Sequence, residues 1–148
     1  MDKSVPGLFV CGAPQLLGRP FLGLFDMETK FEGKPRLIGN LVTDKFVGFE
    51  NHGGRTYLGT DVKPFARVIS GFGNNGEDKT EGAIFKNWIA TYSHGPLLPK
   101  NPDIADWLIK TALEVKYKKE IKLKLLDDTL EWQAHKFILK KYGHSTYS

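Results

Sequence analysis

The chain has 148 residues, 41% of them apolar, which is long enough to bury the core of one domain but too short to indicate two. Its single cysteine excludes an internal disulfide and a thiolate zinc site, and no apolar stretch has the length of a membrane span or the form of a secretory signal. The formal net charge of +4 is too small for a dedicated nucleic-acid-binding protein. We therefore expect one cytoplasmic domain over residues 1–148, with no nucleic-acid partner and no membrane insertion.

Short apolar runs rich in β-branched and aromatic residues alternate with turn-forming residues as far as about residue 92. They predict strands at GLFV (7–10), FLGLFDMET (21–29), RLIGNLVTD (36–44), KFVGFE (45–50), FARVIS (65–70) and AIFKNWIATY (83–92). The first run has no polar alternation, which is typical of a central strand covered on both faces. The APQLLG stretch that follows it predicts a short helix.

The pattern changes to a helical period at about residue 102. Asn101 is the predicted N-cap of a helix with Pro102 at its first position, and its apolar face contains Ile104, Trp107, Leu108, Ala112 and Val115. A second helix is predicted to begin after Asp128, with Glu131 completing a capping box, and to end at Gly143. Its predicted apolar positions are Leu130, Ala134, Phe137 and Ile138.

The single cysteine, Cys11, follows the first predicted strand directly and precedes the short helix. A strand, a sharp turn and a helix form the elbow that displays a nucleophile above a sheet, where the positive end of the helix dipole favours a thiolate. The alternative is that Cys11 is a small buried side chain with no chemical role. The local pattern leaves both interpretations open.

A thiolate mechanism requires a base, and the four histidines differ in their suitability. His94 and His52 each follow a predicted strand, at the kind of sheet edge where sites are built. His135 lies inside the last predicted helix and His144 lies in the C-terminal tail, so both are poor candidates. The sequence therefore favours a site that contains Cys11 with His94 or His52.

The stretch GFGNNG (71–76) matches the spacing of a dinucleotide-binding fingerprint. However, a strand pattern follows it instead of a helix, and no acidic residue lies about twenty residues further on. We interpret it as a tight connection between two strands.

Four stretches in this order carry a family resemblance: VCGAPQLLG (10–18), GFENHGGRTYLG (48–59), GFGNNGEDKTEG (71–82) and TYSHGPLLPKNPDIADWLI (91–109). They resemble the CobB/CobQ-type class I glutamine amidotransferases. The resemblance implies an α/β fold with a flavodoxin-like sheet and helices. It also implies that the chain corresponds to the C-terminal portion of the family domain, without the N-terminal strands and the loop that donates a backbone N–H to the oxyanion.

The resemblance assigns roles to individual residues. It implies that Cys11 attacks the side-chain amide of L-glutamine to form a thioester, and that His94 is the general base. The substrate-binding residues that it implies are Arg36, Gln15, Gly12, Asn51 and His52. For the loop around Glu50, Asn51 and His52, hydrogen bonds that stabilise the loop are an equally open interpretation.

One departure from the family bears on the catalytic base. Many class I amidotransferases carry a glutamate two residues after the histidine, and Pro96 occupies that position here. The acid that orients His94 is then expected from Glu50 or, as we favour, from a partner protein.

The resemblance also implies the setting of the reaction. The partner is a MurT-like ATP-dependent ligase in a heterodimer, which uses the ammonia to amidate D-glutamate in the peptidoglycan precursor lipid II. ATP and magnesium are expected on that partner, with no cofactor and no metal in this chain. The alternative function is that of a shortened or catalytically impaired homologue that only binds the partner.

Overall fold

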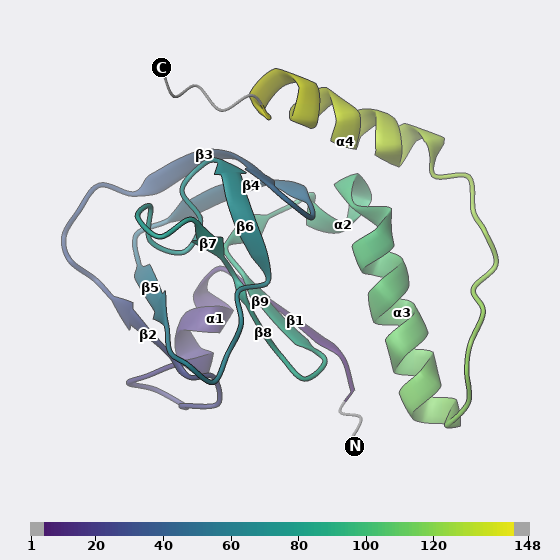
Figure 1. Cartoon of the computed structure of the whole chain (residues 1–148), viewed down its shortest axis with the longest axis horizontal. Helices are drawn as coiled ribbons and strands as arrows, with labels where there is room; N and C mark the ends of the chain where they lie inside the picture. The colour runs from purple at the N-terminus through teal and green to yellow at the C-terminus, as the bar shows by residue number, and fades with distance from the viewer. Residues whose placement is uncertain (1–4, 144–148) are drawn as a thin grey trace.

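The computed structural model describes residues 5–143, which form three small β-sheets and four helices (Figure 1). The first sheet has the order β1-β9-β8, with β1 at Gly7–Val10, β9 at Trp88–Thr91 and β8 at Ala83–Phe85. The second has the order β10-β4-β3-β6-β7, made of Ser93–His94, Val47–His52, Leu37–Thr43, Ala66–Ser70 and Thr80–Glu81. A two-stranded sheet joins β2 (Met27–Lys30) to β5 (Arg55–Leu58). The α/β prediction is confirmed.

The pair β1 and β9 is parallel, and every other pairing between named strands of the described part is antiparallel. Strand β1 has β9 on one side and lies at the edge of its sheet, with all four residues half-buried. The prediction of a central strand covered on both faces was therefore wrong for the described residues. An unbroken apolar run predicts burial on both faces of a strand, but it does not determine how many strands pair with it.

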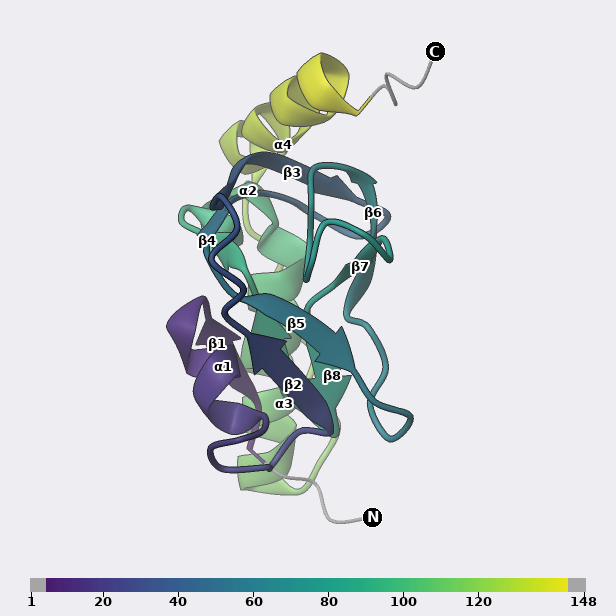
Figure 2. The ribbon, with the colours of Figure 1, turned by 90° about the vertical axis from the view of Figure 1, so that its left-hand side faces the viewer.

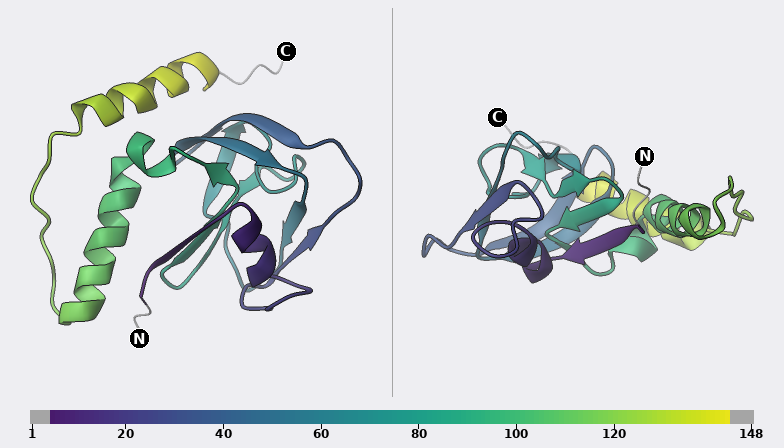
Figure 3. Two further views of the ribbon diagram at one scale, coloured as in Figure 1. Left: turned by 180° about the vertical axis from the view of Figure 1, so that it is seen from behind. Right: turned by 90° about the horizontal axis from the view of Figure 1, so that it is seen from below.

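The helices have the bounds Gly12–Leu17 (α1), Leu97–Lys100 (α2), Pro102–Tyr117 (α3) and Thr129–Tyr142 (α4). Figure 2 shows α1 next to β1, with the β2–β5 pair at the front, and Figure 3 shows α3 and α4 on the opposite side of the molecule from that pair. As predicted, Ile104 of α3 is buried in the main core, and Trp107 and Leu108 pack against that core. Its other members come from β3, β6, β9, α2 and the segments before β4 and β6: Leu41, Phe46, Phe65, Ala66, Val68, Ile89 and Leu97.

Two predicted strands are shorter or divided. The run 83–92 is a hairpin of β8 and β9, and its turn includes Lys86 at a φ of 55°. In the run 21–29 the strand, β2, does not begin until Met27. Phe21 and Leu22 lie before it in an exposed turn. Apolar content alone did not reveal these turns, because neither has the Asn-Gly or Asp-Gly pair that marks a tight hairpin.

The predicted starts of α3 and α4 are accurate, but their predicted caps are not. Asn101 and Asp128 precede α3 and α4, yet neither side chain caps its helix. The Asn101 side chain instead accepts a hydrogen bond from the Val47 N–H at 2.9 Å and donates to the Val47 and Leu97 carbonyls at 2.8 and 2.6 Å. Asp127 accepts from the Thr129 N–H at 3.1 Å.

The predicted apolar face of α4 was only partly correct. Ile138 is buried against Val42 and Val47, with Tyr142 packed against them, whereas Leu130 and Phe137 are 75% and 63% exposed. The four predicted positions lie within about 100° of one another around the helix. However, α4 contacts the rest of the chain through Ile138, Tyr142 and His135, so Leu130 and Phe137 at the other edge of the predicted face remain exposed.

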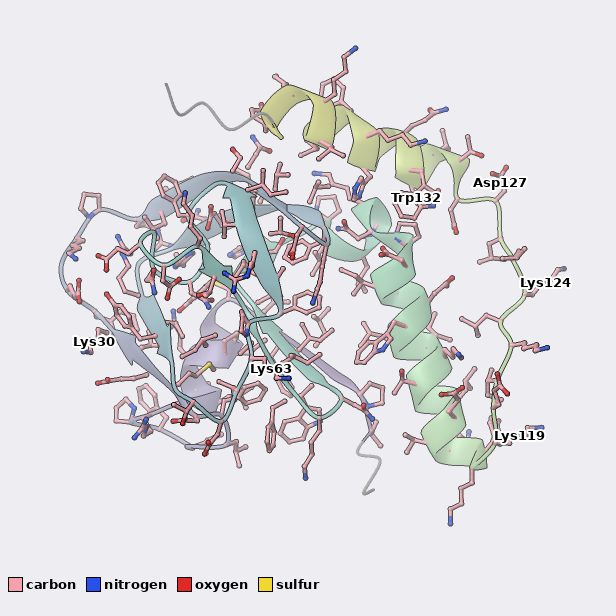
Figure 4. The ribbon with its side chains drawn as sticks, in the orientation of Figure 1. Lys30, Lys63, Lys119, Lys124, Asp127 and Trp132 are labelled. Carbon is pink, nitrogen blue, oxygen red and sulfur yellow. The ribbon has the colours of Figure 1, made fainter. Side chains whose placement is uncertain are left out.

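Residues 118–128 join α3 to α4 without a helix or strand of their own. Figure 4 shows Lys119, Lys124 and Asp127 along this segment at the outside of the molecule, and Trp132 in the first half of α4. No helix of the described residues is long and apolar enough to cross a membrane.

Candidate functional site

Cys11 is the single residue between strand β1 and helix α1. Its backbone has φ 58° and ψ −103°, a conformation that residues with a side chain rarely adopt and that costs of the order of 1–3 kcal/mol. The turn is the strained elbow that the sequence predicted between a strand and a helix. Cys11 is half-buried, so its sulfur is neither enclosed in the core nor fully exposed.

The parallel pairing of β1 and β9 brings the elbow close to the strand that leads to His94. Val10 lies opposite Thr91, and the Cys11 N–H donates to the Thr91 carbonyl oxygen at 2.9 Å. Tyr92 follows Thr91, and Ser93 and His94 then form β10. Cys11 and His94 are thus located at the same carboxyl edge of the parallel pair, where sites in α/β proteins are built.

The ring of His94 is half-buried, and its Nε2 is buried without a hydrogen-bond partner among the described residues. The glycines that follow Cys11 and His94 both border open space, because a Cβ added to Gly12 or Gly95 meets nothing within 4 Å. Both glycines are exposed, so the elbow and the residue after His94 face solvent.

Tyr92 connects the predicted site residues to one another. Its hydroxyl shares a 2.6 Å hydrogen bond with Thr56 Oγ1 and accepts one of 3.3 Å from Gln15 Nε2 of α1. Its ring stacks on His52, with ring centroids 3.7 Å apart. A Cβ on Gly54 would lie 2.7 Å from Thr29 Cγ2 and 2.8 Å from Gln15 Nε2, so a side chain there would displace both neighbours.

The contacts of His52 and Glu50 stabilise the protein's own backbone. This is one of the two interpretations that the sequence left open for their loop, the other being contact with the substrate. His52 Nδ1 lies 2.9 Å from the Gly54 carbonyl oxygen, and Nε2 lies 3.5 Å from Glu50 Oε2. Glu50 is fully buried and accepts the backbone N–H groups of Phe72 and Gly73 at 2.7 and 2.8 Å. These bonds anchor the glycine-rich turn between β6 and β7, and that turn joins two strands as the sequence predicted.

Arg36 lies on the surface, where its Nε and Nη2 donate to the side-chain and backbone oxygens of Asn51 at 2.8 and 2.9 Å. Asn51 is in β4, between Glu50 and His52. Arg36 is therefore connected to the Tyr92 cluster through β4, and its guanidinium makes no direct contact with Cys11. Its predicted role in substrate binding stays a prediction.

His135 was a poor candidate from its sequence position, and its contacts agree with this: Nδ1 lies 2.9 Å from the Lys100 carbonyl oxygen. His144 lies outside the described residues.

Within residues 5–143 no three His, Cys, Asp or Glu side chains are grouped to bind a metal ion. A cavity of about 510 Å³ beside α3 is lined by Phe65, Ile84 and Trp107 among others, and it does not include Cys11.

Sequence reasoning missed Glu81, the last residue of β7. It is fully buried, and Oε1 accepts hydrogen bonds from Thr91 Oγ1 and from the Tyr92 N–H, both at 2.8 Å. Burial raises the pKa of the Glu81 carboxyl group to about 7, and the nearby Glu50 carboxylate adds to this effect. The only sequence signal for this residue was an acid directly before Gly82 and the apolar run that begins at Ala83.

Residues 1–102 match the CobB/CobQ-like glutamine amidotransferase domain. The GatD subunit of the glutamine-hydrolysing lipid II isoglutaminyl synthase of Staphylococcus aureus is 44% identical over 131 residues, which is 78% of this chain and 53% of that protein. The corresponding GatD subunit of Streptococcus pneumoniae is 37% identical over 139 residues, 83% of this chain and 54% of that protein. A probable cobyric acid synthase of Methanothermobacter thermautotrophicus is 33% identical over 123 residues, 64% of this chain and 24% of that protein.

The chain thus spans about half the length of the GatD subunits that it matches. The domain match includes the elbow at Cys11, the Tyr92 cluster and His94, so it covers the whole candidate site. The chain belongs to the family of CobB/CobQ-like glutamine amidotransferase domains.

Proposed function

We propose that this chain carries the glutaminase site of a lipid II isoglutaminyl synthase subunit. It would hydrolyse L-glutamine to glutamate and ammonia, and an ATP-dependent ligase of the MurT type would use the ammonia to amidate D-glutamate in the stem peptide of lipid II. The observation that carries the proposal is the strained elbow at Cys11, hydrogen-bonded to the strand that continues to His94. The similarity to two GatD subunits supports the choice of substrate and pathway.

In the proposed reaction the Cys11 sulfur attacks the amide carbon of the glutamine side chain, and a γ-glutamyl thioester forms as the C–N bond breaks. His94 takes the thiol proton and delivers it to the leaving nitrogen, which departs as ammonia. His94 then removes a proton from the water that attacks the thioester, and glutamate leaves as the sulfur regains its proton. Each step needs an imidazole at the elbow, which is consistent with the unpartnered Nε2 of His94.

The experiment is labelling with 6-diazo-5-oxo-norleucine, a reactive analogue of glutamine, followed by peptide mass spectrometry. The analogue should modify Cys11, and an excess of L-glutamine should protect the site. Cys11→Ala is the control. Modification of another residue, or equal modification of that variant, would contradict the proposal, and no modification at all would favour a homologue that only binds the partner.

We further propose that the partner supplies the acid that orients His94. Among the described residues, the histidine with a carboxylate oxygen within 4 Å is His52, not His94. Glu50, the alternative within the chain, already accepts two backbone N–H groups and lies against His52. An acid provided by the partner would prevent hydrolysis of glutamine when no ligase is bound.

The test compares glutaminase turnover of the protein with and without its ligase. Addition of the ligase should raise kcat far more than it changes KM for glutamine, because an orienting acid acts on the transition state. Full turnover without the ligase would contradict the proposed origin of the acid.

The proposed function also implies that the reaction takes place in the cytoplasm, where the ligase has access to ATP.

A further inference from the structure

Four buried side-chain atoms lack a hydrogen-bond partner among the described residues: Glu81 Oε2, Ser93 Oγ, His94 Nε2 and His52 Nε2. All four belong to residues in, or in contact with, the segment from Thr91 to His94. Glu81 bonds to the first two residues of this segment, and His52 stacks on Tyr92. Unsatisfied buried polar atoms are rare in folded proteins, so their concentration around one segment indicates a role beyond folding.

Thr91 connects Glu81 to both members of the proposed catalytic pair. Its carbonyl oxygen accepts the Cys11 N–H at 2.9 Å, and its hydroxyl donates to Glu81 Oε1 at 2.8 Å. The same hydroxyl accepts the Ser93 N–H at 2.9 Å, one residue before His94. Glu81 Oε1 also accepts the Tyr92 N–H. The carboxyl group of Glu81 therefore stabilises the backbone at Thr91 and Tyr92, where β9 ends and the chain continues to His94.

The charged group that acts most on the Glu81 carboxyl group is the Glu50 carboxylate of β4, a like charge that opposes its ionisation. Beyond Glu50 lie the His52 ring and the stacked Tyr92 phenol, while Arg67 on the neighbouring strand β6 is exposed. Burial places the pKa of Glu81 at about 7, so it loses its proton in the range where the enzyme would work.

We propose that Glu81 is a positioning residue for Cys11 and His94, which holds the Thr91–Tyr92 backbone through its carboxyl group and adds or removes a buried negative charge one hydrogen-bonded residue away from Cys11. When Glu81 is protonated, Glu50 is the buried carboxylate next to it that carries charge. When Glu81 ionises, it adds a second buried negative charge, which disfavours the thiolate of Cys11. This inference relies on the proposed function only in taking Cys11 as the reacting group.

The test is the rate at which iodoacetamide alkylates the protein, measured from pH 5.5 to 9 by mass spectrometry. Cys11 is the single cysteine of the chain, so the rate reports on it alone. Glu81→Gln keeps an oxygen for Thr91 and Tyr92 but cannot ionise. The rate ratio of this variant to the wild type should be near one at the lowest pH and rise on the order of threefold above neutrality. Glu77→Gln, the same change at an exposed position, should give a ratio of one throughout.

A ratio that does not change with pH would overturn the proposal, because a purely structural role gives a constant factor. Thr91→Val serves as a second variant if Glu81→Gln does not fold. This change removes one hydrogen bond that favours the ionised form of Glu81. The alkylation rate of Cys11 should therefore exceed the wild-type rate around neutral pH and return to it at pH 9. No excess around neutral pH would also overturn the proposal. Alkylation needs no glutamine, so a protein that shows these ratios but does not turn over glutamine would contradict the proposed function alone.

Discussion

Replacement of Glu81 by Gln should remove a pH-dependent loss of stability from the chain. Burial raises the pKa of Glu81 from its ordinary value of 4.5 to about 7 in the folded state. Between these two values the folded chain retains a proton that the unfolded chain has released, so the free energy of unfolding falls as pH rises. The loss begins near pH 4.5 and is complete just above pH 7. The difference between the two pKa values corresponds to about 3 kcal/mol.

The glutamine side chain does not titrate, so the free energy of unfolding of Glu81→Gln should lack this decrease. The difference between variant and wild type should therefore grow by about 3 kcal/mol, in favour of the variant, from pH 4.5 to pH 8. Urea unfolding followed by circular dichroism at several pH values measures it, with Glu77→Gln as the matched exposed control. If the curves of Glu81→Gln and the wild type run parallel, Glu81 is ionised in the folded state at pH 5 and the reasoning from burial is refuted.

Two further substitutions test other parts of the structure. Arg36→Lys replaces a planar two-point contact by a single charge, so KM for glutamine should rise on the order of tenfold with little change in kcat, while Arg67→Lys at an exposed position leaves both unchanged. An unchanged KM would mean that Arg36 only stabilises Asn51. Asn101→Ala leaves the N–H and carbonyl of a buried β4 residue without partners and should lower the free energy of unfolding by about 2–4 kcal/mol in urea, compared with less than about 0.5 kcal/mol for the exposed Gln133→Ala. Equal values for these two variants would contradict the role assigned to the Asn101 side chain.

The elbow at Cys11 could be predicted from the sequence because each of its parts has a local signal. An apolar run predicts the strand, and Pro14 near the start of a short apolar stretch predicts the helix. The two predicted elements leave Cys11 and Gly12 for the turn, and in the structure the helix begins one residue earlier, at Gly12. The positions of His94 and His52 at strand ends were predictable for the same reason.

The partners of these residues could not be predicted from the sequence, because they depend on contacts between distant segments. Glu81 meets Thr91 only because β8 and β9 form a hairpin, and the sequence pattern merged these two strands into one. Likewise, Asn101 lies in a good cap position by local rules, but the backbone of β4 offers its amide a buried donor and acceptor. Tertiary hydrogen bonds of this kind override local capping preferences when both groups are removed from water.

Helix α4 packs on the sheet but is joined to the rest of the chain only through the connection from α3. Ile138, Tyr142 and His135 provide its contacts with the rest of the chain, and residues 118–128 keep it close by. A connection of this length maintains an effective concentration on the order of millimolar, which allows weak contacts to be occupied. A single protease cut among the exposed lysines of the connection would turn this association into a bimolecular one. Helix α4 would then dissociate on dilution while the strands around Cys11 retained their own core.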